Sequence, residues 1–294
     1  MHVLLLPASG WGCPPIRQVG GNARRLCYHP LMPLLEIRNL TKIFPLGESI
    51  FGGGAKGELR AVDDVSLDIE SGETLGLVGE SGSGKSTLGR LVLRLIQPTS
   101  GSIHFEGHDL RAANHGEMRR LRRDMQIIFQ DPFGSLDPRM RVEDVITEPL
   151  IIHEPMSPSP RRARVTELLR AVGLDESSLR RFPHEFSGGQ RQRIGIARAL
   201  ALRPKFIVAD EPVSALDVSV GAQIVNLLAK LQQEFKLTYL FISHSMPLVR
   251  YLATRIAVMH HGTIVETGPT QQITEQPKHA YTRSLLQATP EISV

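Results

Sequence analysis

The chain is poor in cysteine and has no long apolar run. Its only cysteines are Cys13 and Cys27, so we expect neither a disulfide nor a thiolate metal site in the rest of the chain. Such usage fits a reducing cytoplasm. No stretch approaches about 18 consecutive apolar residues, so we expect no transmembrane helix. Residues 1–7 have too short an apolar run, and no basic segment, for a secretory signal.

A strong excess of one charge sign is also missing, and aromatic residues are few. The net charge is +4, and aromatic residues make up 5% of the chain. Arginines cluster at 119–123 and 161–164, which is compatible with solvated helix faces or with contacts to anionic lipid headgroups or nucleic acid. No aromatic residues interleave with these clusters as a base-stacking platform requires. We therefore favour solvated faces and expect no nucleic-acid partner.

The strongest feature that is present is a glycine-rich segment between an apolar run, 73–78, and a helical pattern, 88–96. In that context glycines let successive backbone N–H groups form an anion-binding concavity, and the helix N-terminus adds positive charge. The alternative is a purely structural turn. The predicted phosphate-binding residues are Gly79, Glu80, Ser81, Gly82, Ser83, Gly84, Lys85, Ser86 and Thr87. Within this P-loop, Lys85 can reach the β- and γ-phosphates, and the Ser86 hydroxyl suits Mg²⁺.

Polar side chains follow three further apolar runs. Asp210 and Glu211 come directly after one run, Gln130 after a second, and His244 after a third. A single histidine or glutamine at a strand end is usually structural. Their shared position favours function, because open α/β sheets bind ligands at the carboxyl edge. There, Asp210 could hold Mg²⁺ and Glu211 could polarise an attacking water.

Periodicity predicts the surrounding elements. We expect helices over 88–96 and 222–235 and a mostly helical region over 134–203. Strands that alternate with helices predict a mostly parallel sheet with right-handed crossovers. Residues 47–57 are expected to form a loop, and no internal repeat is visible, so we expect one nucleotide site. Strands are expected over 34–40, 61–69, 73–78, 102–107, 125–129, 206–209, 238–242 and 255–259.

Residues 187–190, Ser-Gly-Gly-Gln, complete an ordered set of motifs. The other members of the set are the P-loop, Gln130, the acid pair Asp210 and Glu211, the segment 214–217 and His244. Because of this set, residues 32–270 resemble the ATP-binding-cassette (ABC) ATPases. Phe186 stands where this family usually has leucine, and Ser245 where it usually has aspartate. We expect both departures to be tolerated.

The resemblance implies an α/β fold of the P-loop NTPase class. Its parts would be a RecA-like core, an antiparallel β subdomain and a helical subdomain at about 134–186. ATP and Mg²⁺ would be its ligands, with Ser86, Gln130 and Asp210 on the metal. Catalytic roles would go to Glu211, His244 and Gln130.

The same resemblance implies an ATP sandwich between two cassettes. Phe44 would stack on adenine, and Asp217 would belong to the D-loop. A second, homologous ABC ATPase subunit would complete the sandwich, each cassette presenting its signature to the ATP held by the other. The signature residues are Ser187, Gly188, Gly189 and Gln190.

Three segments resemble the dipeptide/oligopeptide importer branch, which also includes nickel and glutathione importers. They are the insertion 44–57, the stretch 128–140 and the tail 268–286. The branch implies two membrane permease subunits and an extracytoplasmic peptide-binding protein as partners. It also implies a peripheral location at the cytoplasmic face of the cell (inner) membrane, with a groove near Gln130 for a permease helix. Some relatives carry a C-terminal cysteine cluster for an iron–sulfur centre. This chain has no cysteine after Cys27, so we expect that feature to be absent.

Other ATPase classes fit less well. A DNA-repair ATPase needs a long coiled-coil insert between the positions of Lys85 and Ser187, and this chain is too short there to hold one. A translation-factor protein usually carries two cassettes in one chain, whereas this chain carries one. A non-catalytic module would be expected to lack Glu211 or His244, and both are present. An exporter or lipid-transport cassette remains as an alternative.

The expected division of the chain has three parts. Residues 1–31 share no pattern with the cassette, so we expect a poorly ordered extension, with Met32 as an alternative start of translation. Residues 32–270 would form the ABC ATPase domain, and 271–294 a peptide-importer-type extension.

Overall fold

The structure is a computed structural model that describes residues 32–45, 57–154 and 156–288. The chain divides into residues 1–31 and 32–294, and every element below belongs to the second part. The expectations for residues 1–31, and for the loop at 47–57 apart from its last residue, lie outside the described residues. The finer division at residue 270 stays a prediction.

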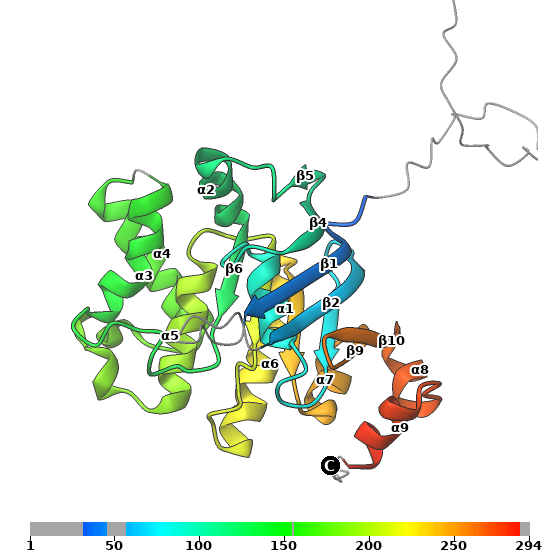
Figure 1. The fold of residues 1–294 in the computed structure, drawn as a ribbon. Helices are drawn as coiled ribbons and strands as arrows, with labels where there is room; N and C mark the ends of the chain where they lie inside the picture. Colours follow the sequence, from blue (N-terminus) through cyan, green and yellow to red (C-terminus); the bar gives the residue numbers. More distant parts are fainter. Residues whose placement is uncertain (1–31, 46–56, 155, 289–294) are drawn as a thin grey trace, which may run out of the picture. The chain divides into compact units, whose positions relative to one another are not determined.

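Two sheets form the framework (Figure 1). The first has the strand order β2-β1-β4-β5 and is antiparallel. Its strands are β1 (Leu35–Pro45), β2 (Glu58–Ile69), β4 (Ser100–Phe105) and β5 (His108–Asp109). The second has the order β10-β9-β3-β8-β7-β6 and is parallel except for β10. Its strands are β3 (Thr74–Val78), β6 (Met125–Ile128), β7 (Phe206–Asp210), β8 (Thr238–Ser243), β9 (Arg255–His260) and β10 (Thr263–Pro269).

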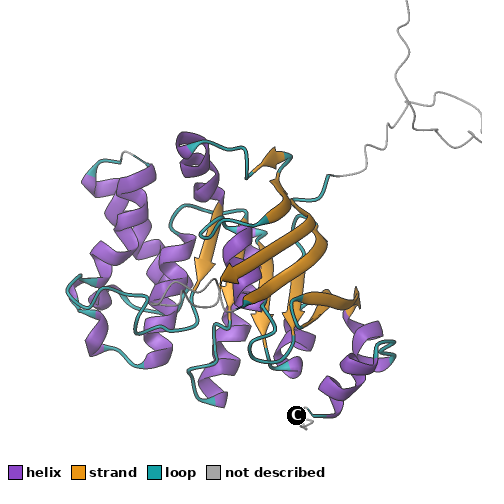
Figure 2. Ribbon diagram, viewed as in Figure 1, coloured by secondary structure: helices purple, strands orange, loops and turns teal. Residues whose placement is uncertain are grey.

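Helices surround the second sheet (Figure 2). Three of them, α3, α4 and α5, group together at the left of Figure 1. None of the helices within the described ranges is both long and apolar enough to cross a membrane. The helices are α1 (Lys85–Val92), α2 (His115–Asp124), α3 (Val142–His153), α4 (Pro158–Ala171), α5 (Gly188–Leu200), α6 (Val218–Phe235), α7 (Met246–Leu252), α8 (Thr270–Glu275) and α9 (Ala280–Gln287), with 3₁₀ turns at Glu176–Arg180 and Pro183–Glu185.

The central strands are buried on both faces. Every residue of β3, β7 and β8 is buried, which is why these strands read as continuous apolar runs. Along β8, Tyr239 and Phe241 join one hydrophobic cluster while Leu240 and Ile242 join another, because successive side chains point to opposite faces. The first cluster includes buried residues of α3–α6. The second includes buried residues of α1 and of the antiparallel sheet.

The α/β fold and its mostly parallel sheet are confirmed, but some boundaries and elements differ from expectation. The P-loop helix runs from Lys85 to Val92 and not over 88–96. It begins early because Gly84 adopts φ 105° at its N-cap, and the chain leaves the helix where Arg94 takes φ 48°. The short elements β5, α7, α8, α9 and β10 were not predicted, and α2 was anticipated only as a helix face that carries the arginines at 119–123, without bounds.

Strand β10 contains a β-bulge. Ile264 lies opposite Met259 and Glu266 lies opposite Val258, so Val265 is an extra residue on the β10 side. The bulge changes the alternation of side chains at Glu266, whose carboxylate then receives the backbone N–H groups of Lys278 and His279 at 2.8 and 3.0 Å.

Candidate active site

A cavity of about 1030 Å³ lies where β3, β6, β7 and β8 end. Because these strands are parallel, the residues that follow them meet at one edge of the sheet. Most of the predicted site residues line this cavity: Phe44, Gly79, Glu80, Ser81, Gly82, Gly84, Lys85, Ser86, Thr87, Gln130, Glu211 and His244. Ser83 and Asp210 are buried beside it.

The P-loop passes so close to neighbouring backbone that two of its glycines have no room for a side chain. A Cβ on Gly79 would lie 2.1 Å from the carbonyl oxygen of Met259, and one on Gly84 would lie 2.0 Å from that of Ala61. Both have positive φ, 155° and 105°. The loop therefore presents its backbone N–H groups as a cradle suited to phosphate.

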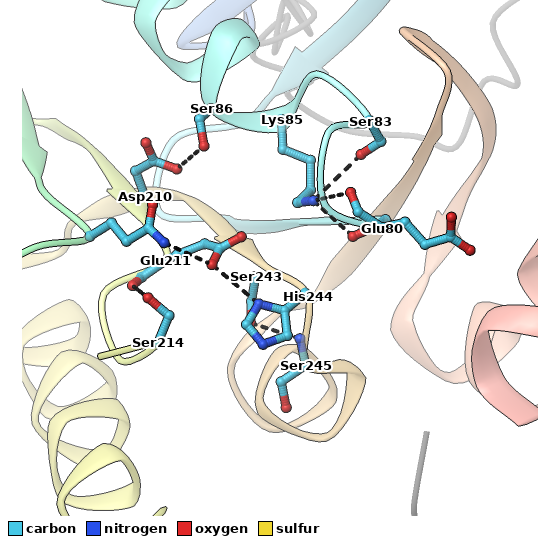
Figure 3. Close-up of polar contacts among 12 residues, drawn as sticks. Glu80, Ser83, Lys85, Ser86, Asp210, Glu211, Ser214, Ser243, His244 and Ser245 are labelled. Atoms are coloured by element: carbon cyan, nitrogen blue, oxygen red, sulfur yellow. Dashed lines mark hydrogen bonds and ion pairs between the residues drawn. The ribbon is translucent and has the colours of Figure 1, made fainter. Parts of the chain in front are cut away.

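The Lys85 ammonium lies inside this loop. Its Nζ donates to the carbonyl oxygens of Gly79 and Glu80, at 2.8 and 2.7 Å (Figure 3). Burial lowers the pKa of Lys85, while the charges of Glu211, Asp210 and Glu80 oppose that shift. A buried ammonium held by two neutral carbonyls is a strong donor that a phosphate can recruit.

Ser86 and Asp210 form a pair of oxygen ligands. Ser86 Oγ donates to Asp210 Oδ1 at 2.7 Å, across α1 and β7 (Figure 3). Burial raises the pKa of Asp210, and the hydrogen bond from Ser86 and the charges of Arg90 and Lys85 oppose the rise. A hydroxyl next to a carboxylate that lacks full charge compensation fits a hard divalent cation.

The Glu211 carboxylate contacts two polar side chains at the end of the sheet. Its Oε2 lies 3.2 Å from His244 Nδ1 (Figure 3). The same oxygen lies 3.4 Å from Gln130 Nε2. Glu211 also adopts φ 46°, a left-handed conformation that costs a non-glycine residue about 1 kcal/mol or more. Its N–H donates to the Ile242 carbonyl at 3.0 Å, which helps to hold this conformation.

The signature residues lie elsewhere. Ser187, Gly188, Gly189 and Gln190 do not line the cavity. They begin α5, where Ser187 and Gln190 form a reciprocal capping box: Gln190 N donates to Ser187 Oγ at 3.4 Å, and Ser187 N donates to Gln190 Oε1 at 3.0 Å. Asp217 is the N-cap residue of α6, without a side-chain capping bond.

Phe44 forms an apolar wall at another side of the cavity. It is in β1, paired with Leu59 of β2, and both side chains line the cavity. The Lys42 ammonium lies 4.8 Å from the centre of the Phe44 ring. The wall can receive a flat aromatic group.

Several cavity residues were not anticipated from the sequence, namely Leu59, Arg60, Ala61, Asp131, Ser214, Ala215, His261, Gly262 and Leu285. Asp131, Ser214 and Ala215 directly follow or lie within predicted motifs, so their positions could have been inferred. His261 and Leu285 lie far along the chain from the P-loop; Leu285 belongs to the tail that resembles the importer branch, but nothing in the sequence assigned either residue to the cavity.

The arginines at 119–123 are mostly engaged with the chain itself. Arg119 and Arg122 donate to the backbone oxygens of Ile152 and Arg94, at 2.6 and 2.9 Å, and Arg123 pairs with Glu154 at 2.5 Å. In the second cluster, Arg164 pairs with Glu167. Both clusters lie on helices, α2 and α4, as expected, but Arg164 is buried and so does not belong to a solvated face.

The comparisons with known proteins agree with this geometry. A family model described as ABC transporter matches residues 62–214. The chain belongs to the ABC transporter ATPase family. A second model, described as the C-terminal region of oligopeptide/dipeptide transporters, matches residues 265–294.

Several ABC relatives are half identical to the chain. The dipeptide transport ATP-binding protein DppF of Lactococcus lactis is 53% identical over 87% of this chain and 81% of its own length. The oligopeptide transport ATP-binding protein OppF of Bacillus subtilis is 52% identical over 87% and 82%. The glutathione import ATP-binding protein GsiA of Escherichia coli is 53% identical over 88% of this chain, which spans only 41% of GsiA.

A solved ABC cassette, MJ0796 as a dimer bound to ADP and Pi, has a TM-score of 0.71 and 32% identity over 80% of this chain and 98% of its own. The chain is therefore an ATP-binding ABC ATPase with the fold of that family.

Proposed function

We propose that this ABC ATPase hydrolyses ATP to drive uptake of dipeptides or oligopeptides through membrane permease subunits. The observation that carries the proposal is the match of residues 265–294 to the C-terminal region of oligopeptide/dipeptide transporters, in a chain whose cavity brings together Lys85, Glu211 and His244. The relatives DppF and OppF, at 53% and 52% identity, support the same cargo class.

Each group in the cavity has a task in this reaction. The P-loop N–H groups and Lys85 bind the phosphates, and Phe44 stacks on the base. Glu211 accepts a proton from the attacking water, while Gln130 and His244 hold its carboxylate in position. Ser86 and Asp210, with Gln130, would hold Mg²⁺. When bound, Mg²⁺ neutralises charge on the phosphates.

We infer that the signature of this chain serves the ATP of a second cassette. Its capping box leaves the first backbone N–H groups of α5 available, and a helix N-terminus favours an anion. Asp217 of the D-loop begins the next helix, α6. A second homologous ABC ATPase would supply the corresponding signature to the cavity of this chain. ATP thereby joins the two cassettes, and its hydrolysis separates them.

Partners of two further kinds follow from the proposal. Two permease subunits hold the chain at the cytoplasmic face of the cell membrane, where ATP is available, and an extracytoplasmic protein delivers the peptide. The surface near Gln130 and the helices α3–α5 receives a permease helix. Cargo specificity then belongs to the permeases and the delivery protein.

A strain that lacks this gene tests the cargo. It should fail to grow on a di- or oligopeptide as the only source of an essential amino acid, and the free amino acid should restore growth. Undiminished peptide uptake, in a strain without a redundant cassette, would refute the cargo and leave the ATPase unaffected.

Glutathione is a second candidate cargo, because GsiA is 53% identical over the matched region. The same strain, supplied with glutathione or with nickel in place of peptide, separates these alternatives. If growth depended on the gene with glutathione or with nickel but not with peptide, that cargo would replace the peptide assignment.

A further inference from the structure

The C-terminal helix α9 contacts the P-loop, from the other end of the described chain. Tyr281, in its first turn, accepts a hydrogen bond from the backbone N–H of Glu80 at 3.0 Å, across 201 residues of sequence. One turn later, Leu285 lines the ATP cavity on the same face of the helix. The family model of residues 265–294 covers both residues.

The bond from Glu80 matters because of the peptide group to which it belongs. The N–H of Glu80 and the C=O of Gly79 are the two polar groups of one planar unit, and they point in opposite directions. The C=O of Gly79 accepts from Lys85 Nζ at 2.8 Å. Tyr281 and Lys85 therefore hold the same peptide group from its two sides.

Tyr281 is itself held firmly in place. Its ring stacks on the His260 ring at 3.8 Å between centroids, with 29° between the planes. His260 ends β9, and two residues later Gly262 N donates to Ser83 O of the P-loop at 3.0 Å. Two contacts therefore run from the end of β9 to the P-loop, one direct and one through Tyr281.

The segment before Tyr281 is also fixed. Glu266 accepts the backbone N–H groups of Lys278 and His279, and His279 Nδ1 accepts the N–H of Tyr281 at 3.2 Å. Tyr281, Leu285 and Leu286 pack against the larger hydrophobic cluster. A phenol anchored in this way can orient a backbone group, because little freedom remains for it to lose.

We propose that Tyr281 is a positioning residue of the ATP site, which orients the Gly79–Glu80 peptide and, through its carbonyl, the Lys85 ammonium. The C-terminal region is then part of the machinery that binds ATP, in addition to any role in transport. This inference rests on ATP as the substrate and is independent of the cargo.

The test is Tyr281→Phe in the full chain, which removes the hydroxyl and keeps the ring on His260. The matched control is Tyr251→Phe, the same change at an exposed tyrosine on α7. For both variants, equilibrium binding of a fluorescent ATP analogue is measured on the chain, and steady-state hydrolysis is measured in the assembled transporter. Because a hydrogen bond of this kind contributes about 0.5–1.5 kcal/mol, we expect Kd and KM to rise about two- to tenfold in Tyr281→Phe, with a smaller change in kcat.

The control should keep the wild-type Kd, KM and kcat. Equal Kd and KM in Tyr281→Phe and wild type would overturn the proposal, since α9 would then only pack beside the P-loop. A fall in kcat at unchanged Kd would overturn it as well, and so would equal losses in both variants. A wild-type chain that binds no ATP would instead refute the proposed ATPase function.

Discussion

Glu211 combines a strained backbone with a carboxylate that two polar side chains hold. Its φ of 46° persists because its N–H is bonded to Ile242 O and its side chain contacts Gln130 and His244. Strain of this kind, kept at the end of a buried strand, is expected where a group must be aimed at a reacting atom.

Glu211→Gln should remove most ATP turnover, about 100-fold or more, because the amide cannot accept the proton of the attacking water. ATP binding should persist, since the P-loop and Lys85 are unchanged. The measurements are hydrolysis in the assembled transporter and equilibrium ATP binding. Glu234→Gln, an exposed site on α6, is the control. Near-normal turnover in Glu211→Gln would contradict the role given to this residue.

Lys85→Ala should act on binding. Hydrogen bonds from a charged donor contribute roughly 1.5–3 kcal/mol, so the Kd for ATP should rise by about tenfold or more. Urea unfolding should show little loss of stability, because the burial that lowers the pKa of Lys85 also makes its charge costly in the folded state. Lys230→Ala on α6, which is exposed, should alter neither quantity. Wild-type ATP affinity in Lys85→Ala would be inconsistent with its place in the P-loop.

At the scale of elements, α5 offers a contrast between two of its glycines. A Cβ on Gly195 meets nothing within 4 Å, whereas one on Gly189 would lie 2.4 Å from Val220 Cγ1 of α6. Gly195→Ala should therefore raise the free energy of unfolding by about 0.5–1 kcal/mol, because alanine loses less backbone entropy in a helix. Gly189→Ala should lower it. Urea denaturation of both variants measures these changes in the free energy of unfolding. A Gly195→Ala variant less stable than wild type would mean that the space beside Gly195 is not open.

The attachment of α9 should depend on pH through Glu266. Partial burial favours a higher pKa for Glu266, but hydrogen bonds that include those from the backbone of Lys278 and His279 outweigh it and lower the pKa below 4.5. A carboxylate whose pKa is lower in the folded than in the unfolded state stabilises the fold at pH values above its unfolded pKa. This stabilisation is lost as the pH falls through its folded pKa.

Glu266→Gln should consequently be less stable than wild type by ~1 kcal/mol at pH 7, allowing for solvent screening. The difference in unfolding free energy should shrink as the pH falls below about 4.5. Glu275→Gln on α8, an exposed position, serves as the comparison. A difference that grows on acidification would reverse the sign and contradict the assignment.

Elements with a strong local pattern were predictable, and those without one were not. The apolar runs that became β3, β7 and β8 are buried on both faces, so composition alone identifies them. Helix α2 buries only Met118 and is rich in arginine, so its apolar side is narrow, limited to Met118 and the partly buried Leu121, and its Asn114–Glu117 capping box is the sharper local signal.

The candidate site was predictable to the extent that its residues belong to ordered motifs. Parallel strands bring Lys85, Gln130, Glu211 and His244 to one edge whatever the loops between them do. The contact of Tyr281 with Glu80 depends on how the last helix packs, and no periodicity encodes a pairing across 201 residues. The tail was recognised as a subfamily feature without any indication that it reaches the P-loop.

At the scale of the whole molecule, the signature residues lie outside the cavity of their own chain, and the proposal gives them a second nucleotide. Ser187 has two possible tasks, to cap α5 and to contact the ATP of a second cassette, and two variants separate them. Aspartate is a good N-cap, so Ser187→Asp should keep the unfolding free energy within ~0.5 kcal/mol, while Ser187→Ala should lose about 1 kcal/mol.

Ser187→Asp should nevertheless lose most turnover in the assembled transporter, because its carboxylate repels phosphate. Binding of ATP to the isolated chain should stay at the wild-type level, since Ser187 does not line the cavity of its own chain. Full turnover in Ser187→Asp would indicate that the residue only caps the helix.

The bulge in β10 makes this strand more sensitive to a deletion than to a substitution. Val265 is the extra residue, so its removal would restore a regular ladder of hydrogen bonds between β9 and β10. The side chains on one side of the deletion would then turn to the opposite face of the sheet. Glu266 would then point away from Lys278 and His279, and the tail would lose its tether without any change to its own sequence. Val265 packs against the larger hydrophobic cluster, so families that keep this tail should exchange apolar residues at position 265 but conserve the length of the strand, a spacing rule that an alignment scored by residue identity would overlook.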